Sequence, residues 1–493
     1  MQTIKTGDMQ QGERRILEIK NEVPWVKFLP WLLLIIGIYS FPLSLIERGF
    51  SHIPGDMGDS RFNMYVLEHG FKFMSGEVKE YWNAPFLYPY THTIALSDNL
   101  LGTLPVYGLF RMLHCDRELA FQFWFISLFV LNFIFCYLAL KKWTSHTILS
   151  SVGAYIFAFS IIVLGNINHI QTFPRFITPF VIYWFWMYLS TKENRYFMFT
   201  MLGLTFQFYC AMYLGFFLSF ILLFFVLAYL FVYKDFALFT QFRNVRKIGS
   251  HLLMLLLTVV LLYPLIQPYV EISRQFGYRE FAEVFSYLPT WRSYFSSTPE
   301  PVLWNFLTWH IRPTMNNWWE QFLFPGALPW LAITFFPFVL LSKKVCSNNK
   351  KLVALSILVL FLTIIFSMRM NNFTLYKVFF SLPGFGSMRS INRLINLEIF
   401  LFVLILVFVG KALIESYKNF QYFLLFLPLL VIADNAVDYW ERRILKTDVH
   451  SRISFVRDNI QIQRNPNYKT IYYRAKAENE NLVYSDDSVP VFR

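Results

Sequence analysis

The sequence is poor in charged residues and in cysteine for its length. Asp, Glu, Lys and Arg make up 15% of the 493 residues, whereas about 25% is typical of soluble domains. Hydrophobic residues make up 56% and aromatic residues 20%, with 57 Phe, and a water-facing surface could not carry so many large apolar rings. This composition excludes a soluble globular protein and predicts that much of the surface faces lipid.

The sequence has four cysteines, and their positions suggest no disulfide pair and do not have the spacing of metal ligands. A disulfide framework is therefore excluded. The four are Cys115, Cys136, Cys210 and Cys346. No cleavage site follows the first apolar stretch, so we expect an uncleaved signal anchor. The formal net charge of +13 is explained by loops that face anionic membrane lipids, and nothing indicates nucleic-acid binding.

The sequence contains instead long runs without charge, each close to the ~20 apolar residues that cross ~30 Å of hydrocarbon. Residues 196–233 form one block of 38 residues, roughly 57 Å as a helix, and predict two crossings with a turn at Gly215. The other predicted spans are 28–46, 119–140, 147–164, 174–191, 250–268, 321–342, 352–368, 394–411 and 419–435. We therefore expect an all-α polytopic membrane protein with about eleven (10–13) transmembrane helices and structured outer loops.

The distribution of Lys and Arg predicts the orientation of these spans. With the N-terminus inside, the inner loops hold 14 Lys and Arg in 44 residues, whereas the outer loops hold 15 in 165. The positive-inside rule then predicts a cytoplasmic tail at 1–24, a membrane domain at 25–435 and a short outer tail at 436–493. This pattern requires the short apolar segment 99–113 to be re-entrant or interfacial. The inner loops are 141–146, 191–195, 234–249, 343–351 and 411–418, and the outer loops are 47–118, 165–175, 267–322 and 368–393.

The first outer loop begins directly after the first span and carries Asp56 and Asp59 among turn-forming glycines. A carboxylate at the lip of a membrane cavity can act as a general base, and two close carboxylates can hold a divalent cation. The alternative is that an Asp caps the helix expected from Arg61 onward. Both residues are therefore candidate catalytic residues and candidate metal ligands.

Three further outer loops supply candidates for binding an anionic donor. His169 lies on the same predicted face as Asp59, although a lone His is more often structural. Arg292 lies among Tyr and Trp residues in 267–322, which suits lipid phosphate but equally fits an interfacial aromatic belt. Arg389 and Arg393 share a helical face at the mouth of a span, beside a Gly- and Pro-rich turn, and can either bind phosphate or snorkel to the interface.

This arrangement resembles the GT-C superfamily of membrane glycosyltransferases, whose hallmark is an acidic motif in the first outer loop, here Asp56-Met57-Gly58-Asp59. Residues 55–102 are similar to a group of largely uncharacterised bacterial membrane proteins, and segments 320–326 and 383–393 resemble bacterial YfhO-like relatives. The order of spans and loops is similar over most of the membrane region, but the residues themselves are similar only in a few short segments. The chain departs from better-known GT-C enzymes in having no large soluble C-terminal domain.

The resemblance implies transfer of a hexosyl or pentosyl group from a polyprenyl-phosphate sugar donor to a lipid or glycan acceptor, on the outer face of the bacterial inner (cytoplasmic) membrane. Asp59 would accept the acceptor proton, and Arg389 and Arg393 would stabilise the phosphate leaving group. No cofactor is required; a divalent cation, if used, would bind at Asp56 and Asp59.

Two other functions stay open. A lipid or glycan transporter or flippase would move its substrate without covalent change, but such carriers often have midplane ionisable groups and internal repeats, and the sequence shows neither. A membrane O-acyltransferase would require a His at membrane depth, whereas His169 and His251 fall near the ends of predicted spans.

Overall fold

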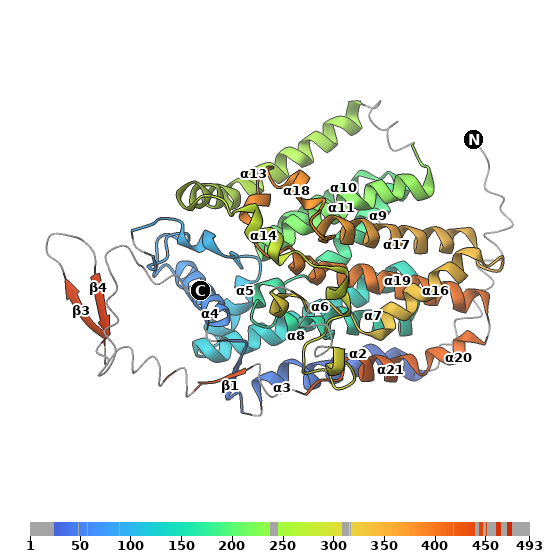
Figure 1. Ribbon diagram of the computed structural model, residues 1–493, viewed down its shortest axis with the longest axis horizontal. Helices are drawn as coiled ribbons and strands as arrows, with labels where there is room; N and C mark the ends of the chain where they lie inside the picture. Colours follow the sequence, from blue (N-terminus) through green and yellow to red (C-terminus); the bar gives the residue numbers. More distant parts are fainter. Residues whose placement is uncertain are drawn as a thin grey trace.

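The computed structural model describes residues 24–438 except 48, 57, 88, 237–244, 308–314, 316 and 418, together with 443–446, 450, 460–464 and 471–475. Within these residues the chain is mostly helical, and the long helices lie side by side as a bundle (Figure 1). Among the described residues, seven helices are long and apolar enough to cross a membrane, which supports a predominantly helical membrane protein. They are Trp25–Ile46, Arg117–Thr144, Thr147–Gly165, Met212–Tyr233, Val245–Phe276, Ser347–Ser367 and Ile391–Ser416.

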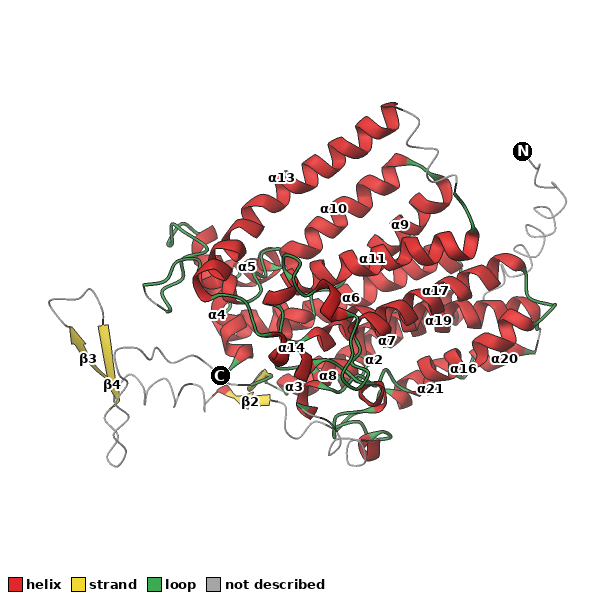
Figure 2. Ribbon diagram, turned by 45° about the horizontal axis from the view of Figure 1, so that its top comes forward, coloured by secondary structure: helices red, strands yellow, loops and turns green. Residues whose placement is uncertain are grey.

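Shorter helices lie in the loops between the long helices (Figure 2). The helices are α2 (Leu29–Ser40), α3 (Pro42–Ile46), α4 (Asp59–Met74), α5 (Leu104–Met112), α6 (Arg117–Thr144), α7 (Thr147–Phe159), α8 (Ile162–Gly165), α9 (Thr178–Thr191), α10 (Asn194–Cys210), α11 (Met212–Tyr233), α13 (Val245–Phe276), α14 (Phe281–Tyr287), α16 (Ala327–Leu341), α17 (Ser347–Ser367), α18 (Tyr376–Phe379), α19 (Ile395–Ser416), α20 (Phe420–Leu424) and α21 (Leu427–Asp434). Two antiparallel strand pairs are β1 (His52–Pro54) with β2 (Arg443–Leu445), and β3 (Ile460–Arg464) with β4 (Ile471–Ala475).

Each of the eleven predicted spans overlaps a helix, but in four of these spans no single helix is long enough for a full crossing. Helix α9 has 14 residues, α10 has 17 and α16 has 15. The predicted span 419–435 is divided into α20 and α21. Most of the predicted C-terminal tail and residues 1–23 of the predicted N-terminal tail lie outside the described residues.

The uncharged block 196–233 is a helical hairpin, as predicted, but its turn is not at Gly215. Helix α10 ends at Cys210 and α11 begins at Met212, with Ala211 between them in an extended conformation. A Cβ on Gly215 would lie 2.8 Å from the Cα of Phe208, although residues seven apart in one helix are roughly 10 Å apart. Gly215 therefore permits the close approach of the two arms, while Ala211 makes the turn.

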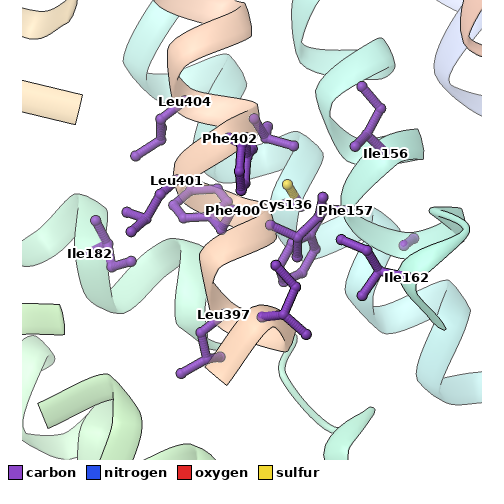
Figure 3. Close-up of a cluster of buried hydrophobic side chains, with 14 of the residues drawn as sticks. Cys136, Ile156, Phe157, Ile162, Ile182, Leu397, Phe400, Leu401, Phe402 and Leu404 are labelled. Carbon is purple, nitrogen blue, oxygen red and sulfur yellow. The ribbon is translucent and has the colours of Figure 1, made fainter. Parts of the chain in front are cut away.

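The core of the bundle is built around α7 and α19. In the most apolar 18-residue stretch of the spans that contain α7 and α19, 94% and 89% of the residues are buried inside the protein. The corresponding share for α13 is 6%. Small residues allow this packing, because a Cβ on Gly153 of α7 would lie 2.9 Å from Val403 of α19. Figure 3 shows side chains of α6, α7, α8, α9 and α19 meeting in this core, with Phe157 beside Phe400.

The loops separate into two groups at opposite ends of the bundle, as the alternating spans predict. At the first end, which we call the loop end, Asn63 of the first outer loop donates to Gln171 at 2.8 Å. The other end, called the basic end, holds the described parts of the predicted inner loops. There Lys192 lies 2.8 Å from Asp235. Figure 1 shows α4, α5, α14 and β1 together at the loop end.

The chain returns to the loop end after α21. Asp438 donates its backbone N–H to Glu300 at 2.8 Å, and β2 then pairs with β1, which directly precedes the acidic segment of the first loop. The N–H of Lys446 donates to Ser51 at 3.0 Å. The C-terminal segment thus supports the loop that carries Asp56 and Asp59.

Candidate functional site at the loop end

Four loops meet around His169. Its Nδ1 lies 2.8 Å from Oδ2 of Asp59, and its Nε2 lies 3.2 Å from Oε1 of Glu320. Arg393 approaches the same ring, with one terminal nitrogen 3.3 Å from Nδ1 and 3.1 Å from Nε2. A nitrogen nearly equidistant from both ring nitrogens must lie over the ring, because an in-plane position would clash with a ring carbon. We call Asp59, His169, Glu320 and Arg393 the acidic–basic cluster.

The two predicted acidic residues of the first loop have different environments. Asp56 uses Oδ1 to accept the backbone N–H groups of Gly58 and Ser60, at 3.1 and 3.3 Å, and so secures the start of α4. Asp59 is the first residue of α4, and its half-exposed side chain turns to His169 instead. The capping alternative therefore applies to Asp56, whereas Asp59 is available to a ligand.

A glycine fixes the path of the chain into this segment. Gly55 has φ +91°, a region that other residues rarely adopt. A Cβ there would lie 1.8 Å from Oγ of Ser60 and 3.1 Å from the carbonyl oxygen of Ile167. The first loop can approach the His169 loop this closely only because residue 55 has no side chain.

Glu320 was not singled out as a site residue, although its segment was part of the GT-C resemblance. It ends the short 3₁₀ helix Trp318–Glu320, and its side chain is 7% exposed. Besides His169, it lies 3.6 Å from Arg393, and Asn392 donates to its backbone oxygen. The only sequence signal was a carboxylate next to an aromatic pair just before a predicted span.

The two predicted arginines lie in the same region but differ in burial. Arg393 is 10% exposed, and its guanidinium lies over the ring of Tyr213, 5.6 Å from the centroid. Arg389 is partly exposed, stacks 5.1 Å from the ring centroid of Tyr287, and donates its backbone N–H to the Tyr213 hydroxyl. Both arginines are thus held by aromatic rings rather than extended into solvent.

The charges of this region keep its carboxylates ionised. Burial by itself would raise the pKa of Asp59. The hydrogen bond and charge of His169 and the charges of Arg393 and Arg389 outweigh this effect, so the pKa of Asp59 lies below its usual value. Burial likewise opposes ionisation of Glu320, yet His169, Arg393 and Arg389 lower its pKa to about 2. Two carboxylates therefore remain charged beside two arginines at neutral pH.

Several buried polar atoms beside the cluster have no hydrogen-bond partner among the described residues. They are Nε of Arg393, Oδ1 of Asn392, Oγ of Ser390 and Oδ1 of Asn63. Unpaired buried polar groups are costly, so their concentration next to the cluster is characteristic of a site that binds a polar ligand or ordered water.

Two other candidates are placed differently. Arg292 is exposed and lies over the ring of Trp291 at 5.4 Å, and it is not among the cations that lower the pKa of Asp59 or Glu320. Among the described residues, no group of three His, Cys, Asp or Glu side chains converges as metal ligands. A cation bound at Asp56 and Asp59 would have to compete with the backbone N–H groups that Asp56 already accepts.

Asp98 supports the cluster indirectly. Its carboxylate accepts the N–H of Tyr213 at 3.3 Å, at the start of α11. Burial raises its pKa to about 6, against the opposing effects of the Tyr213 and Met212 N–H groups and of Arg393. Asp98 thus holds the first turn of α11, which in turn positions Tyr213 under Arg393.

No protein-family model matches this sequence, and no curated protein or solved structure shows significant similarity to it.

Proposed function

We propose that this protein is a membrane glycosyltransferase with a GT-C-like arrangement of about eleven crossings. It would transfer a sugar from a polyprenyl-phosphate donor to a lipid or glycan hydroxyl at the loop end. The supporting observation is the half-exposed carboxylate of Asp59, held ionised by His169 on its inner side and flanked by Arg393 and Arg389. An accessible base beside fixed cations suits a reaction in which a hydroxyl loses a proton while a phosphate departs.

In this proposal Asp59 is the general base. The acceptor hydroxyl attacks the anomeric carbon of the donor sugar, its proton passes to Asp59, and the bond to the phosphate oxygen breaks. The electron pair of that bond leaves with the phosphate, so negative charge develops on its oxygen. Arg389 and Arg393 would stabilise that charge, because preorganised cations act most strongly where charge appears in the transition state.

Asp56 has a supporting part in the same proposal. Since its carboxylate already accepts two N–H groups at the start of α4, it keeps Asp59 in position rather than exchanging protons itself. A divalent cation is not needed for this scheme, because Arg389 and Arg393 supply positive charge.

The direct test is to incubate the purified protein with radiolabelled polyprenyl-phosphate sugars and membrane lipid acceptors. We expect sugar transfer, or slow release of free sugar when the acceptor is omitted. Reconstituted vesicles with labelled donor in one leaflet provide the second arm. Movement of intact donor across the bilayer, with no covalent product, would reject the transferase and support the lipid or glycan transporter.

A further inference from the structure

A cavity of about 530 Å³ lies between the first outer loop and helices α4, α10 and α13, away from the acidic–basic cluster. Phe73, which lines one side of it, is about four helical turns from Asp59 along α4, or roughly 21 Å. The apolar side of the cavity is formed by Tyr209 of α10 and by Pro264 and Leu265 of α13. Its volume falls within the range of small-molecule sites.

The polar side of the cavity carries two opposite charges on adjacent residues. Lys79 and Glu80 both line it, and neither forms an ion pair with another described residue. The Glu80 carboxylate accepts a hydrogen bond from the side chain of Asn83, which holds it in place. His92 also lines the cavity, but its Nδ1 already lies 3.0 Å from Glu271. Lys79 and Glu80 are therefore the charges that a ligand with one anionic and one cationic group would complement.

The aromatic residues of the cavity indicate its depth in the membrane. Tyr81 and Trp82 line it, and the Trp82 ring packs against the rings of Tyr81 and Tyr269, with centroids 5.2 and 5.8 Å apart. Trp and Tyr are enriched where the hydrocarbon meets the lipid head groups. The cavity thus lies at the level of the head groups on the loop side.

Two exposed apolar stripes lead from the cavity along the membrane helices. Figure 2 shows α13 at the edge of the bundle with α10 beside it, and the Tyr209 hydroxyl donates to the Leu261 oxygen at 2.7 Å. Residues three or four apart share a helix face, so each stripe continues the face that meets the cavity. The stripe before Tyr209 is Phe199, Leu202 and Phe206, and the stripe before Pro264 is Leu253, Leu257 and Val260; all six side chains are 37–65% exposed.

We propose that this cavity binds a phospholipid whose head group has both a phosphate and an ammonium, with its two acyl chains along the stripes of α10 and α13. Lys79 pairs with the phosphate and Glu80 with the ammonium. From Phe199 to Tyr209 the stripe measures roughly 15 Å, which is half of the ~30 Å hydrocarbon and suits a chain of one leaflet.

The head group and the chains both separate this lipid from the proposed donor. A polyprenyl phosphate has one chain and no ammonium, so it would leave one stripe and Glu80 without a partner. The bound phospholipid instead joins α13 to α10, where it is needed, because only 6% of the most apolar stretch of α13 is buried inside the protein. The site is thus additional to the proposed function and does not depend on it.

Photo-crosslinking tests the site in the purified full chain. The probe is phosphatidylethanolamine with a diazirine in one acyl chain, in detergent micelles, and the labelled peptides are identified by mass spectrometry. We expect labelling of residues 199–209 and 253–264, and unlabelled phosphatidylethanolamine should compete roughly two- to fivefold better than phosphatidylglycerol, the range set by an exposed ion pair. Equal competition would show surrounding lipid only and would overturn the proposal, as would labelling elsewhere.

Two substitutions separate the two charges. Glu80→Gln should abolish the preference for phosphatidylethanolamine while leaving phosphatidylglycerol binding unchanged, whereas Lys79→Gln should weaken both lipids. Glu77→Gln and Lys72→Gln are the matched controls, since these exposed residues line a different cavity and should keep the wild-type preference. A Glu80→Gln protein that still prefers phosphatidylethanolamine contradicts the assignment.

Thermal stability gives a second measurement on the same proteins. Phosphatidylethanolamine should raise the unfolding temperature of the wild type more than phosphatidylglycerol does, and Glu80→Gln should lose this difference. If the variants do not fold, the wild-type competition decides the matter alone. None of these measurements involves sugar transfer, so the proposed function can fail while the lipid site stands, and the reverse.

Discussion

The two ends of the bundle both carry ion pairs, but they are built differently. At the basic end the pairs are partly exposed, and some join near neighbours, as in Lys411 with Glu415, or Arg195 with Glu193. At the loop end, Glu320 and Arg393 are each no more than 10% exposed. They meet with His169 and Asp59 from four separate loops.

This difference indicates what each end is for. Exposed pairs contribute only about 0–1 kcal/mol, so those at the basic end are compatible with a loop surface that simply faces water and lipid headgroups. Desolvating several charges in one place is expensive, and such clusters occur preferentially at functional sites. We therefore expect perturbations of one end to leave the other end unaffected.

The orientation of the chain in the membrane can be tested by cysteine labelling, which should give an all-or-none result. Cys346 is exposed at the basic end, which the positive-inside rule places in the cytoplasm. In a Cys115→Ser background, a membrane-impermeant maleimide should label Cys346 only after the cells are permeabilised. A cysteine introduced at the exposed Ser75, at the loop end, should be labelled in intact cells. The reverse pattern would place the proposed site in the cytoplasm.

Asp59→Asn should produce the largest loss of activity. Asn keeps the shape but cannot accept the proton, so transfer should fall by roughly 10²–10⁴-fold. Folding should survive, since Asp56 rather than Asp59 secures the start of α4. Transfer kinetics and thermal stability in detergent are the measurements, and near-normal turnover by the Asp59→Asn variant would remove Asp59 from the mechanism.

Acid should destabilise the loop end through Glu320. Because its pKa is lowered from 4.5 to about 2, its contribution to stability is fully present above about pH 4.5 and is lost as the pH falls toward 2. The shift corresponds to roughly 3 kcal/mol. Thermal unfolding across this pH range should show the loss in the wild type and a flatter dependence in Glu320→Gln; parallel curves would contradict the burial and pairing of this carboxylate.

Arg393→Ala should weaken donor use more than Arg389→Ala, because Arg393 is more buried and belongs to the cluster. Loss of a charge-assisted hydrogen bond costs roughly 1.5–3 kcal/mol, and Lys should restore little where the planar guanidinium stacks on Tyr213. Donor titrations of both Ala and Lys variants provide the comparison. Equal, wild-type affinities would mean that both arginines only snorkel to the interface.

The smallest effect is expected at the basic end. Lys192→Ala removes the pair with Asp235 and a contact over the ring of Tyr229. The free energy of unfolding should change by only about 0.2–1 kcal/mol, and transfer should be unaffected. A loss of transfer comparable to that of Arg393→Ala would show that the two ends are coupled.

Much of the site was predictable as a set of candidates but not as a structure. Asp59, His169 and Arg393 were assigned to one face from the order of spans and loops alone. Their contacts were not, because His169 lies 110 residues from Asp59 and 224 from Arg393 along the chain. No pattern among neighbouring residues indicates a contact between residues so far apart in the sequence. Glu320 was harder to predict as a site residue, since a single carboxylate in an aromatic loop looks like the many carboxylates that simply face solvent.

The sequence by itself determined where the chain is apolar and hence where its membrane helices lie, since hydrocarbon excludes charged groups and leaves only the helix to satisfy a lipid-exposed backbone. Tertiary packing decided what the polar residues do. It made the turn at Ala211 rather than Gly215, because the arms of the hairpin cross closely at that glycine. It placed Asp56 at the start of α4 and Asp59 against His169, because Gly55 lets the first outer loop approach the loop that carries His169. Hydrophobicity is a property of each residue, whereas a hydrogen bond between distant loops exists only once the helices that carry them have packed.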